Sequence, residues 1–109
     1  MTLIIRIDGT QHWLDDGRRH REYGPAIIDA DGTQEWWVDN KCHREDSPAY
    51  INADGTQEWY IDGKRHREDG PAVIHAIGTQ EWFIDGEQVK EEDFEEAVKL
   101  YHCRQILES

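Results

Sequence analysis

The sequence predicts a mainly β fold, an antiparallel meander of 23-residue β-hairpin repeats closed by a C-terminal α-helix. Three observations predict it: a tetrapeptide that returns at a fixed period, columns of tryptophan and aspartate that return with it, and a helical pattern after residue 90. The 109 residues are enough for a single domain, 1–109. We expect about 3.5 to 4 repeat units over residues 3–90 and a capping helix over residues 91–108.

The period is set by the tetrapeptide Asp-Gly-Thr-Gln, which begins at Asp8, Asp31 and Asp54 and returns in altered form at Ile77. The tryptophan column consists of Trp13, Trp36, Trp59 and Trp82. The aspartate column consists of Asp16, Asp39, Asp62 and Asp85. No insertion interrupts the period, and an insertion would break the stacking of neighbouring units, so the pattern indicates one backbone unit used repeatedly.

Each unit is expected to hold two short strands joined by an Asp-Gly turn, which is a strong hairpin signal. In the third unit these strands are 50–53 and 57–61. Residues 3–7 occupy the columns of a first strand, so the sequence begins half-way through a unit. After residue 90 the apolar residues Phe94, Ala97, Val98 and Tyr101 follow helical spacing. A helix at this place would cover the last apolar rung of the array, which has no next repeat.

The alternation of side chains across a strand predicts which face is the core. The small apolar residues of the first strand, such as Ala26 and Ile28, are expected opposite Trp36 and Val38. That register needs a loop of odd length, such as three residues with glycine in the left-handed position. The tryptophan column would then be the buried core.

The opposite face carries an aromatic row edged with carboxylates, and it is the candidate binding site. Its proposed partner-binding residues are Trp37, Tyr60, Phe83, Tyr50, Glu35, Glu58, Glu81 and Asp29. Two interpretations stay open for this row. In the first interpretation, sheet curvature or the capping helix covers the row. In the second, the row is a binding interface, because exposed aromatic residues concentrate binding energy.

The run Glu58–Lys64 (Glu-Trp-Tyr-Ile-Asp-Gly-Lys), the run His66–Ala72 (His-Arg-Glu-Asp-Gly-Pro-Ala) and the 23-residue period resemble MORN-type repeats. The resemblance is to the variant repeat arrays of bacterial, phage and giant-virus proteins, and it covers residues 3 to about 90. It implies single-layer β-hairpin arrays without catalysis, which serve as scaffolds for varied partners.

The repeated histidines are possible metal ligands or bases, namely His20, His43 and His66. Equivalent residues lie two strands apart, about 9.6 Å, which is too far for two ligands of one metal. We therefore expect them to tie each turn to the next unit. No phosphate-binding loop, Ser-His-Asp grouping or Cys-x-x-Cys pair is present, so the sequence predicts no enzyme, no metal and no cofactor. A His/carboxylate active site is the least favoured alternative.

Residues that depart from the repeat are the better functional candidates. Cys42 stands where the other units have Arg19 and Arg65, and it is expected to lie exposed near a turn. In the helix, Leu100, Cys103 and Leu107 form a second apolar stripe away from Phe94. A helix with two apolar faces is either fully buried or pairs with another chain, so this stripe predicts a homodimer.

The charge narrows the class of partner. With 12 basic and 24 acidic residues the net charge is −12, which disfavours direct binding of nucleic acid or anionic membranes and favours a basic protein partner. Two cysteines and no secretory leader predict a cytoplasmic protein, in the host cytoplasm if it is viral. The leading hypothesis is a non-enzymatic, phage- or virus-like accessory protein that blocks a nucleic-acid-handling host protein, such as a defence or CRISPR-type nuclease. A scaffold or assembly protein is the alternative.

Overall fold

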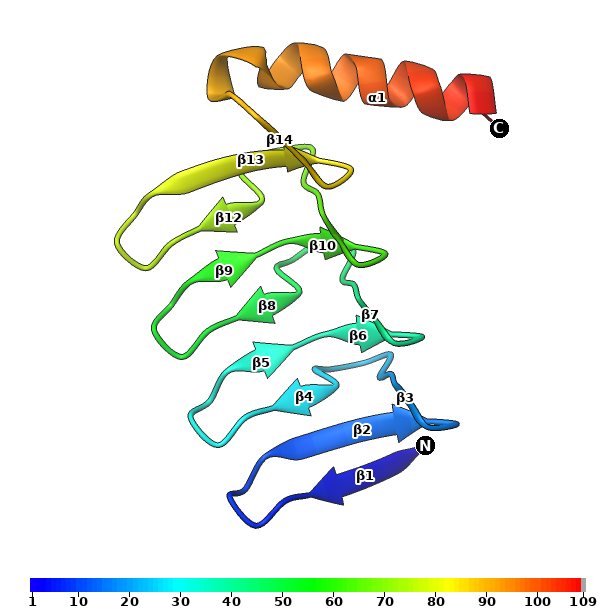
Figure 1. The fold of residues 1–109 in the computed structure, drawn as a ribbon, viewed down its shortest axis with the longest axis vertical. Coiled ribbons are helices and arrows are strands. Elements are labelled where there is room, and N and C mark those ends of the chain that lie inside the picture. Colours follow the sequence, from blue (N-terminus) through cyan, green and yellow to red (C-terminus); the bar gives the residue numbers. More distant parts are fainter. Residues whose placement is uncertain (109) are drawn as a thin grey trace.

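The computed structural model describes residues 1–108 and confirms the predicted fold, a mainly β antiparallel meander of hairpins that ends in a single helix packed on the sheet (Figure 1). The strands are β1 (Thr2–Ile5), β2 (Gln11–Asp15), β3 (Arg18–Arg19), β4 (Ile27–Ile28), β5 (Gln34–Glu35), β6 (Trp37–Val38), β7 (Lys41–Cys42), β8 (Tyr50–Ile51), β9 (Gln57–Glu58), β10 (Tyr60–Ile61), β11 (Lys64–Arg65), β12 (Val73–Ile74), β13 (Gln80–Ile84) and β14 (Glu87–Val89). A short 3₁₀ turn, η1 (Glu91–Asp93), leads into α1 (Phe94–Glu108).

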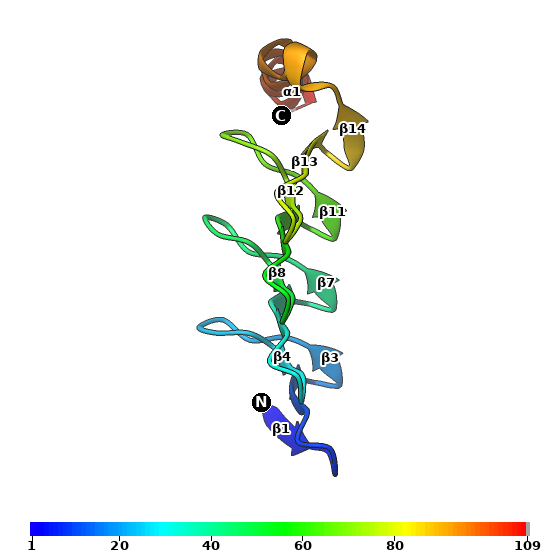
Figure 2. The ribbon, with the colours of Figure 1, turned by 90° about the vertical axis from the view of Figure 1, so that its left-hand side faces the viewer.

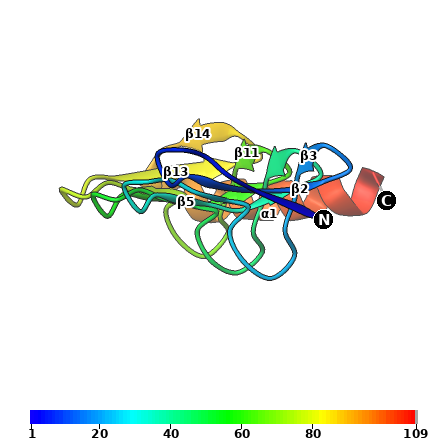
Figure 3. The ribbon, with the colours of Figure 1, turned by 90° about the horizontal axis from the view of Figure 1, so that it is seen from below.

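The strands form one thin layer, and the molecule measures 47 × 37 × 18 Å (Figure 2). The main sheet has the order β1-β2-β4-β5-β8-β9-β12-β13-β14, while β6–β7 and β10–β11 pair as separate short ribbons. Seen along the array (Figure 3), the ribbon tips at β3, β11 and β14 lie on one side, and the loops that lead to β4, β8 and β12 project from the other. A single sheet has no second layer, so each face must be covered by its own loops and side chains.

The register is the one that the residue pattern predicts. Ile27 lies opposite Glu35 and Ile28 opposite Gln34. The backbone N–H of Asp29 donates to the Thr33 carbonyl at 2.9 Å, which leaves a loop of three residues. Gly32 closes that loop with a φ of +94°, the left-handed conformation that glycine adopts without strain. The face of each strand residue is therefore as predicted.

The core differs from the prediction. The buried apolar side chains are Ala26, Ile27, Ala49, Ala72, Val73, Phe83 and Ile84. The tryptophan column is only half-buried, and in the first three units an arginine guanidinium lies on the ring, as Arg67 does 3.9 Å from the centre of Trp59. The reason is the single layer: the alanines of this face are fully covered, while the outer surface of the first three indoles meets an arginine and solvent rather than a second sheet.

The repeated histidines have the structural role that their spacing predicts. The Nδ1 atoms of His20, His43 and His66 accept hydrogen bonds from backbone N–H groups of the next unit, those of Asp39, Asp62 and Asp85. The donor–acceptor distances are 3.1, 2.9 and 2.8 Å. Each histidine thus ties its loop to the following turn.

The two ends of the array are finished differently. At the C-terminal end, the predicted helix residues Phe94, Ala97, Val98 and Tyr101 are half-buried, and the Tyr101 ring lies 4.7 Å from the ring of His66. His102 also bonds Glu68. At the other end β1 is the outermost strand of the sheet, and its apolar side chains are exposed. Within residues 1–108, no helix is long and apolar enough to cross a membrane.

Candidate protein-binding face

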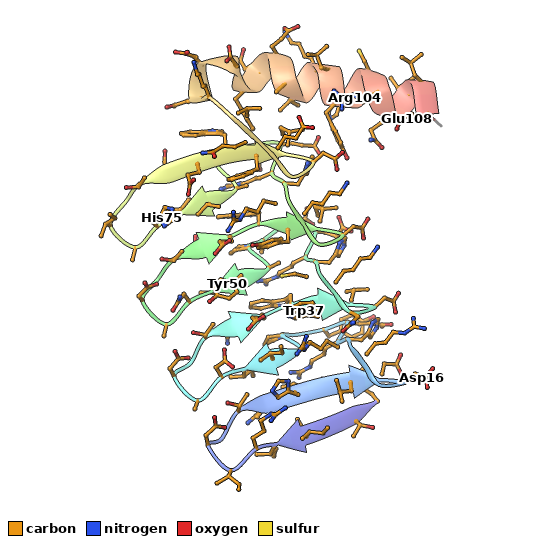
Figure 4. The ribbon with its side chains drawn as sticks, in the orientation of Figure 1. Asp16, Trp37, Tyr50, His75, Arg104 and Glu108 are labelled. Carbon is orange, nitrogen blue, oxygen red and sulfur yellow. The ribbon has the colours of Figure 1, made fainter. Side chains whose placement is uncertain are left out.

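The predicted row of rings lies on one side of the sheet, the aromatic face. Trp37 comes from β6, Tyr60 from β10 and Phe83 from β13, one from each successive unit. Tyr50 of β8 stands opposite Glu58 of β9 and shares the same side. In Figure 4 the labelled Trp37 and Tyr50 lie in the middle of the array, away from both of its ends.

Not every member of the row is accessible. Trp37, Tyr60 and Tyr50 are half-buried, but Phe83 is only 7% exposed and packs in a cluster with Ala72 and Val73. At its C-terminal end the row is therefore covered, as in the first of the two interpretations. In the fourth unit the smaller Val73 replaces a tyrosine at its column, and the ring of Phe83 fills the space.

The glutamates of the face hold the rings in place. The indole N–H of Trp37 donates to Glu35 at 3.1 Å, and the Tyr60 hydroxyl donates to Glu58 at 2.8 Å. Glu81 bonds His75 at 2.6 Å and Gln88 at 3.2 Å. All three carboxylates are half-buried rather than free, so their role in steering a partner at long range is smaller than the sequence suggests.

A row of arginines covers the rings of this face from the ribbons. Arg19 of β3 lies 5.2 Å from the ring centre of Trp37 in the next unit, and Arg65 of β11 lies 5.3 Å from that of Phe83. Arg65 also donates from Nε to Glu58 at 3.0 Å. In the third unit a guanidinium therefore meets both a ring and a carboxylate, which is a favourable arrangement for a cation.

Cys42 interrupts this row in the second unit. The structure places its side chain half-buried, with Sγ 3.8 Å from the Ala49 carbonyl oxygen, and not exposed at the turn as predicted. Beside it is an open hollow of about 480 Å³, the Cys42 hollow. Its lining residues are Glu35, Trp37, Asn40, Lys41, Cys42, Tyr50, Tyr60 and Gly63. The sequence shows that an arginine is missing here, but not that this arginine covers a ring.

The surroundings of the hollow are electronegative. Burial, followed by the charges of Glu35 and Glu58, raises the pKa of the Cys42 thiol to about 12. Burial raises the pKa of Tyr60 to about 12, with the hydrogen bond to Glu58 as the next cause. The pKa of Tyr50 is raised by burial and then by the negative charges of Glu35, Glu58 and Asp29. Asp29 therefore adds to the negative potential near Tyr50. At neutral pH the thiol is protonated, so Cys42 is a poor nucleophile.

Exposed acids lie along both long edges of the sheet. At the hairpin turns, Asp31 and Asp54 each accept a backbone N–H from a threonine two residues on, which lowers the pKa of their carboxyl groups. At the ribbon tips, the positive-φ aspartates are Asp16, Asp39, Asp62 and Asp85. The negative charges of these aspartates therefore lie along the rim of the aromatic face.

The remaining predicted and possible sites are less organised. Leu100 and Leu107 of the helix stripe are 53% and 84% exposed, and Cys103 is exposed with a free thiol. A groove between two projecting loops holds Glu45, Asp46 and Trp59, but the guanidinium of Arg67 already covers the ring. In the part of the chain that the structure describes, no three His, Cys, Asp or Glu residues are grouped as metal ligands.

Comparison of this chain with known protein families, with characterised proteins and with solved structures finds no match.

Proposed function

We propose that this protein is a non-enzymatic protein-interaction module that binds a basic partner through the aromatic face. The observation that carries the proposal is the set of half-buried rings Trp37, Tyr50 and Tyr60 around one hollow, with Glu35 and Glu58 fixed beneath them. Rings held by hydrogen bonds lose little conformational freedom on binding, and tyrosine and tryptophan are the residues that most often dominate interface energies.

The charge distribution supports a basic partner. The net charge is −12, and the exposed aspartates at the rim would attract a positively charged surface and orient it over the rings. Carboxylates repeated at a fixed spacing along a rigid array also resemble the regular charges of a nucleic-acid backbone. We therefore propose a nucleic-acid-handling protein as the partner class, and a phage- or virus-like accessory role in the cytoplasm, blocking a defence or CRISPR-type nuclease.

A scaffold role is the second proposal, and it is favoured by the helix stripe. Leu100 and Leu107 stay exposed although α1 packs on the sheet by its other side. Light scattering on the Leu100→Glu plus Leu107→Glu variant should show a monomer if this stripe joins two copies. A parent protein that is monomeric at high concentration contradicts the homodimer.

Differential capture tests the proposed function. The parent protein and two variants, Tyr60→Ala and Glu108→Lys, are immobilised and exposed to the same host lysate. Glu108 lies at the far end of α1, so its variant is a control for a charge change away from the face (Figure 4). We expect a basic protein retained by the parent and by Glu108→Lys, and bound at least about tenfold more weakly by Tyr60→Ala.

Salt dependence separates the two contributions. Association with the captured protein should slow steeply as salt rises, because the rim charges are screened, while dissociation should depend mainly on the rings. Equal capture by the parent and by Tyr60→Ala would show that this face is not the site.

A further inference from the structure

The third unit shows which side chain occupies the position equivalent to the Cys42 hollow. Residue 65 of the third unit is an arginine whose Nε bonds Glu58 at 3.0 Å and whose guanidinium lies 6.0 Å from the ring centre of Tyr60 and 5.3 Å from that of Phe83. Arg19 of the first unit lies in the same way over Trp37. In the third unit one cation therefore lies between two successive rings and also neutralises the carboxylate there.

The second unit has the same carboxylate and the same rings without the cation. Shifted by one period, Arg65 corresponds to Cys42, Glu58 to Glu35, and Phe83 to Tyr60. The thiol is too short to reach either group and turns to the Ala49 carbonyl oxygen. Among residues 1–108 Glu35 forms no ion pair, and its one side-chain hydrogen bond is accepted from the Trp37 indole N–H.

The neighbouring lysine does not take the place of the missing arginine. The side chain of Lys41 packs against the backbone of Gly63: its Cβ atom lies 3.8 Å from the position that a Cβ atom would take on that glycine. The equivalent Lys64 follows Gly86 in the same way and ends 3.5 Å from Asp85 at the ribbon tip. Lys41 therefore forms part of the rim of the hollow, and the space between Trp37 and Tyr60 stays open.

We propose that the Cys42 hollow binds one cationic side chain of the partner, an arginine in preference to a lysine, between Trp37 and Tyr60 and against Glu35. The site rests on the proposed function for the identity of its partner, but its chemistry can be tested without that partner. A guanidinium is planar, so it stacks on a ring while its N–H groups donate to a carboxylate, whereas an ammonium is a compact and more strongly hydrated charge. The hollow is also large enough to admit the whole side chain, since its volume lies within the range of small-ligand sites.

The electrostatic potential in the Cys42 hollow is negative. Burial, followed by the charges of Glu35 and Glu58, raises the pKa of the Cys42 thiol and of the Tyr50 hydroxyl. Glu58 is paired with Arg65, so Glu35 is the carboxylate whose charge is left without an ion-pair partner at the hollow, and it favours a positively charged occupant. The site would thus select against acidic and neutral side chains as well as for basic ones.

The test uses N-acetyl-L-arginine amide as the probe, followed in the NMR spectrum of the parent protein. Its uncharged analogue, N-acetyl-L-citrulline amide, has nearly the same shape and is the matched probe. We expect arginine amide to shift the indole N–H signal of Trp37 in a saturable way with a Kd on the order of 1 mM, and the citrulline probe to bind at least about tenfold more weakly. Equal shifts with the two probes, or no saturable shift with arginine, would overturn the inference.

Two substitutions with the same added charge complete the test. Cys42→Arg places the array's own guanidinium in the hollow, and it restores the residue found in the first and third units, so the fold should be kept. Gln88→Arg adds the same charge to the same column of the fourth unit, beside Glu81 and outside the hollow. The probe should lose its saturable shift in Cys42→Arg and keep it in Gln88→Arg; retention in Cys42→Arg would contradict the proposed site.

The same variants distinguish failure of this inference from failure of the proposed function. If Tyr60→Ala loses the captured partner while Cys42→Arg binds it with the parent's affinity, the aromatic face is the interface, but the hollow takes no cation. If Cys42→Arg also weakens capture by at least about tenfold, both proposals are supported.

Discussion

The two faces of this single sheet use the same ring-and-cation contact, but in the first three units the tryptophan side makes it every time and the aromatic face lacks it once. On the tryptophan side, Arg21, Arg44 and Arg67 lie 3.9, 4.0 and 3.9 Å from the ring centres of their tryptophans. On the aromatic face the corresponding contacts exist for Arg19 and Arg65, at 5.2 and 5.3 Å, and are missing at Cys42.

The tryptophan side is fixed by more than the ring contact. Each of its arginines also donates from Nη1 to a proline carbonyl at 3.0–3.2 Å, and the neighbouring histidine bonds the next unit. A side chain engaged in this way in three units has a structural role. A function is best sought where a contact made elsewhere in the array is absent, and within the first three units that place is the Cys42 hollow.

The largest expected effect is on stability, and it contrasts the two faces directly. Trp59 packs on the cluster of Ala72, Val73 and Phe83, so Trp59→Ala should lower the free energy of unfolding by about 2–3 kcal/mol. Tyr60 lies at the open hollow, and Tyr60→Ala should cost about 1 kcal/mol or less. Urea titrations of the two variants measure the difference; equal losses would mean that the faces are not distinct.

A smaller effect is expected from the links between units. His66 is 6% exposed and accepts the Asp85 N–H, so His66→Ala should cost about 1–2 kcal/mol. His20→Ala should cost less, because the equivalent bond to Asp39 is longer, at 3.1 Å, and carries no contact with the capping helix. The reverse order in thermal unfolding would mean that the helix end is not tied down through His66.

The smallest effect is a pH dependence at the capping helix. Hydrogen bonds from His66, then from His102, lower the pKa of the Glu68 carboxyl below its ordinary value of 4.5. The folded protein thus binds that proton less readily than the unfolded chain, so the contribution of Glu68 is present above pH 4.5 and is lost as the pH falls through the lowered folded-state pKa.

Glu68→Gln should therefore flatten the fall in melting temperature between neutral and acidic pH. Glu22→Gln is the matched control, since Glu22 occupies the same column of the first unit and lies 3.9 Å from His20. An unchanged pH profile in Glu68→Gln would show that the carboxyl contributes nothing to folding.

The sequence predicts the architecture because the repeat makes each signal appear several times. The three-residue loop closed by Gly32, the histidine links and the capping helix each follow from local rules of turn geometry and periodicity. The degree of burial does not follow from those rules. Phe83 packs in a cluster with Ala72 and Val73 and lies under the Arg65 guanidinium, and these contacts depend on how neighbouring units fold together.

The site is predicted only in outline for a similar reason. The sequence places Trp37, Tyr50 and Tyr60 on one face and marks Cys42 as a departure from the repeat. It does not show that the side chain at this column reaches a ring in the following unit, because that contact spans 18 positions and depends on how far the ribbons fold over the sheet. The glutamates illustrate the same limit, since their bonds to the rings can be seen only in three dimensions.

The most direct test compares the two faces in one spectrum. The five tryptophans include four of the tryptophan column and Trp37 of the aromatic face, and each gives one indole N–H signal. When the captured basic protein is added to the labelled chain, the signal of Trp37 should shift or broaden, while those of Trp13, Trp36, Trp59 and Trp82 should stay in place. Perturbation of the tryptophan column with an unchanged Trp37 would contradict the account, because it would place the partner on the opposite face of the sheet.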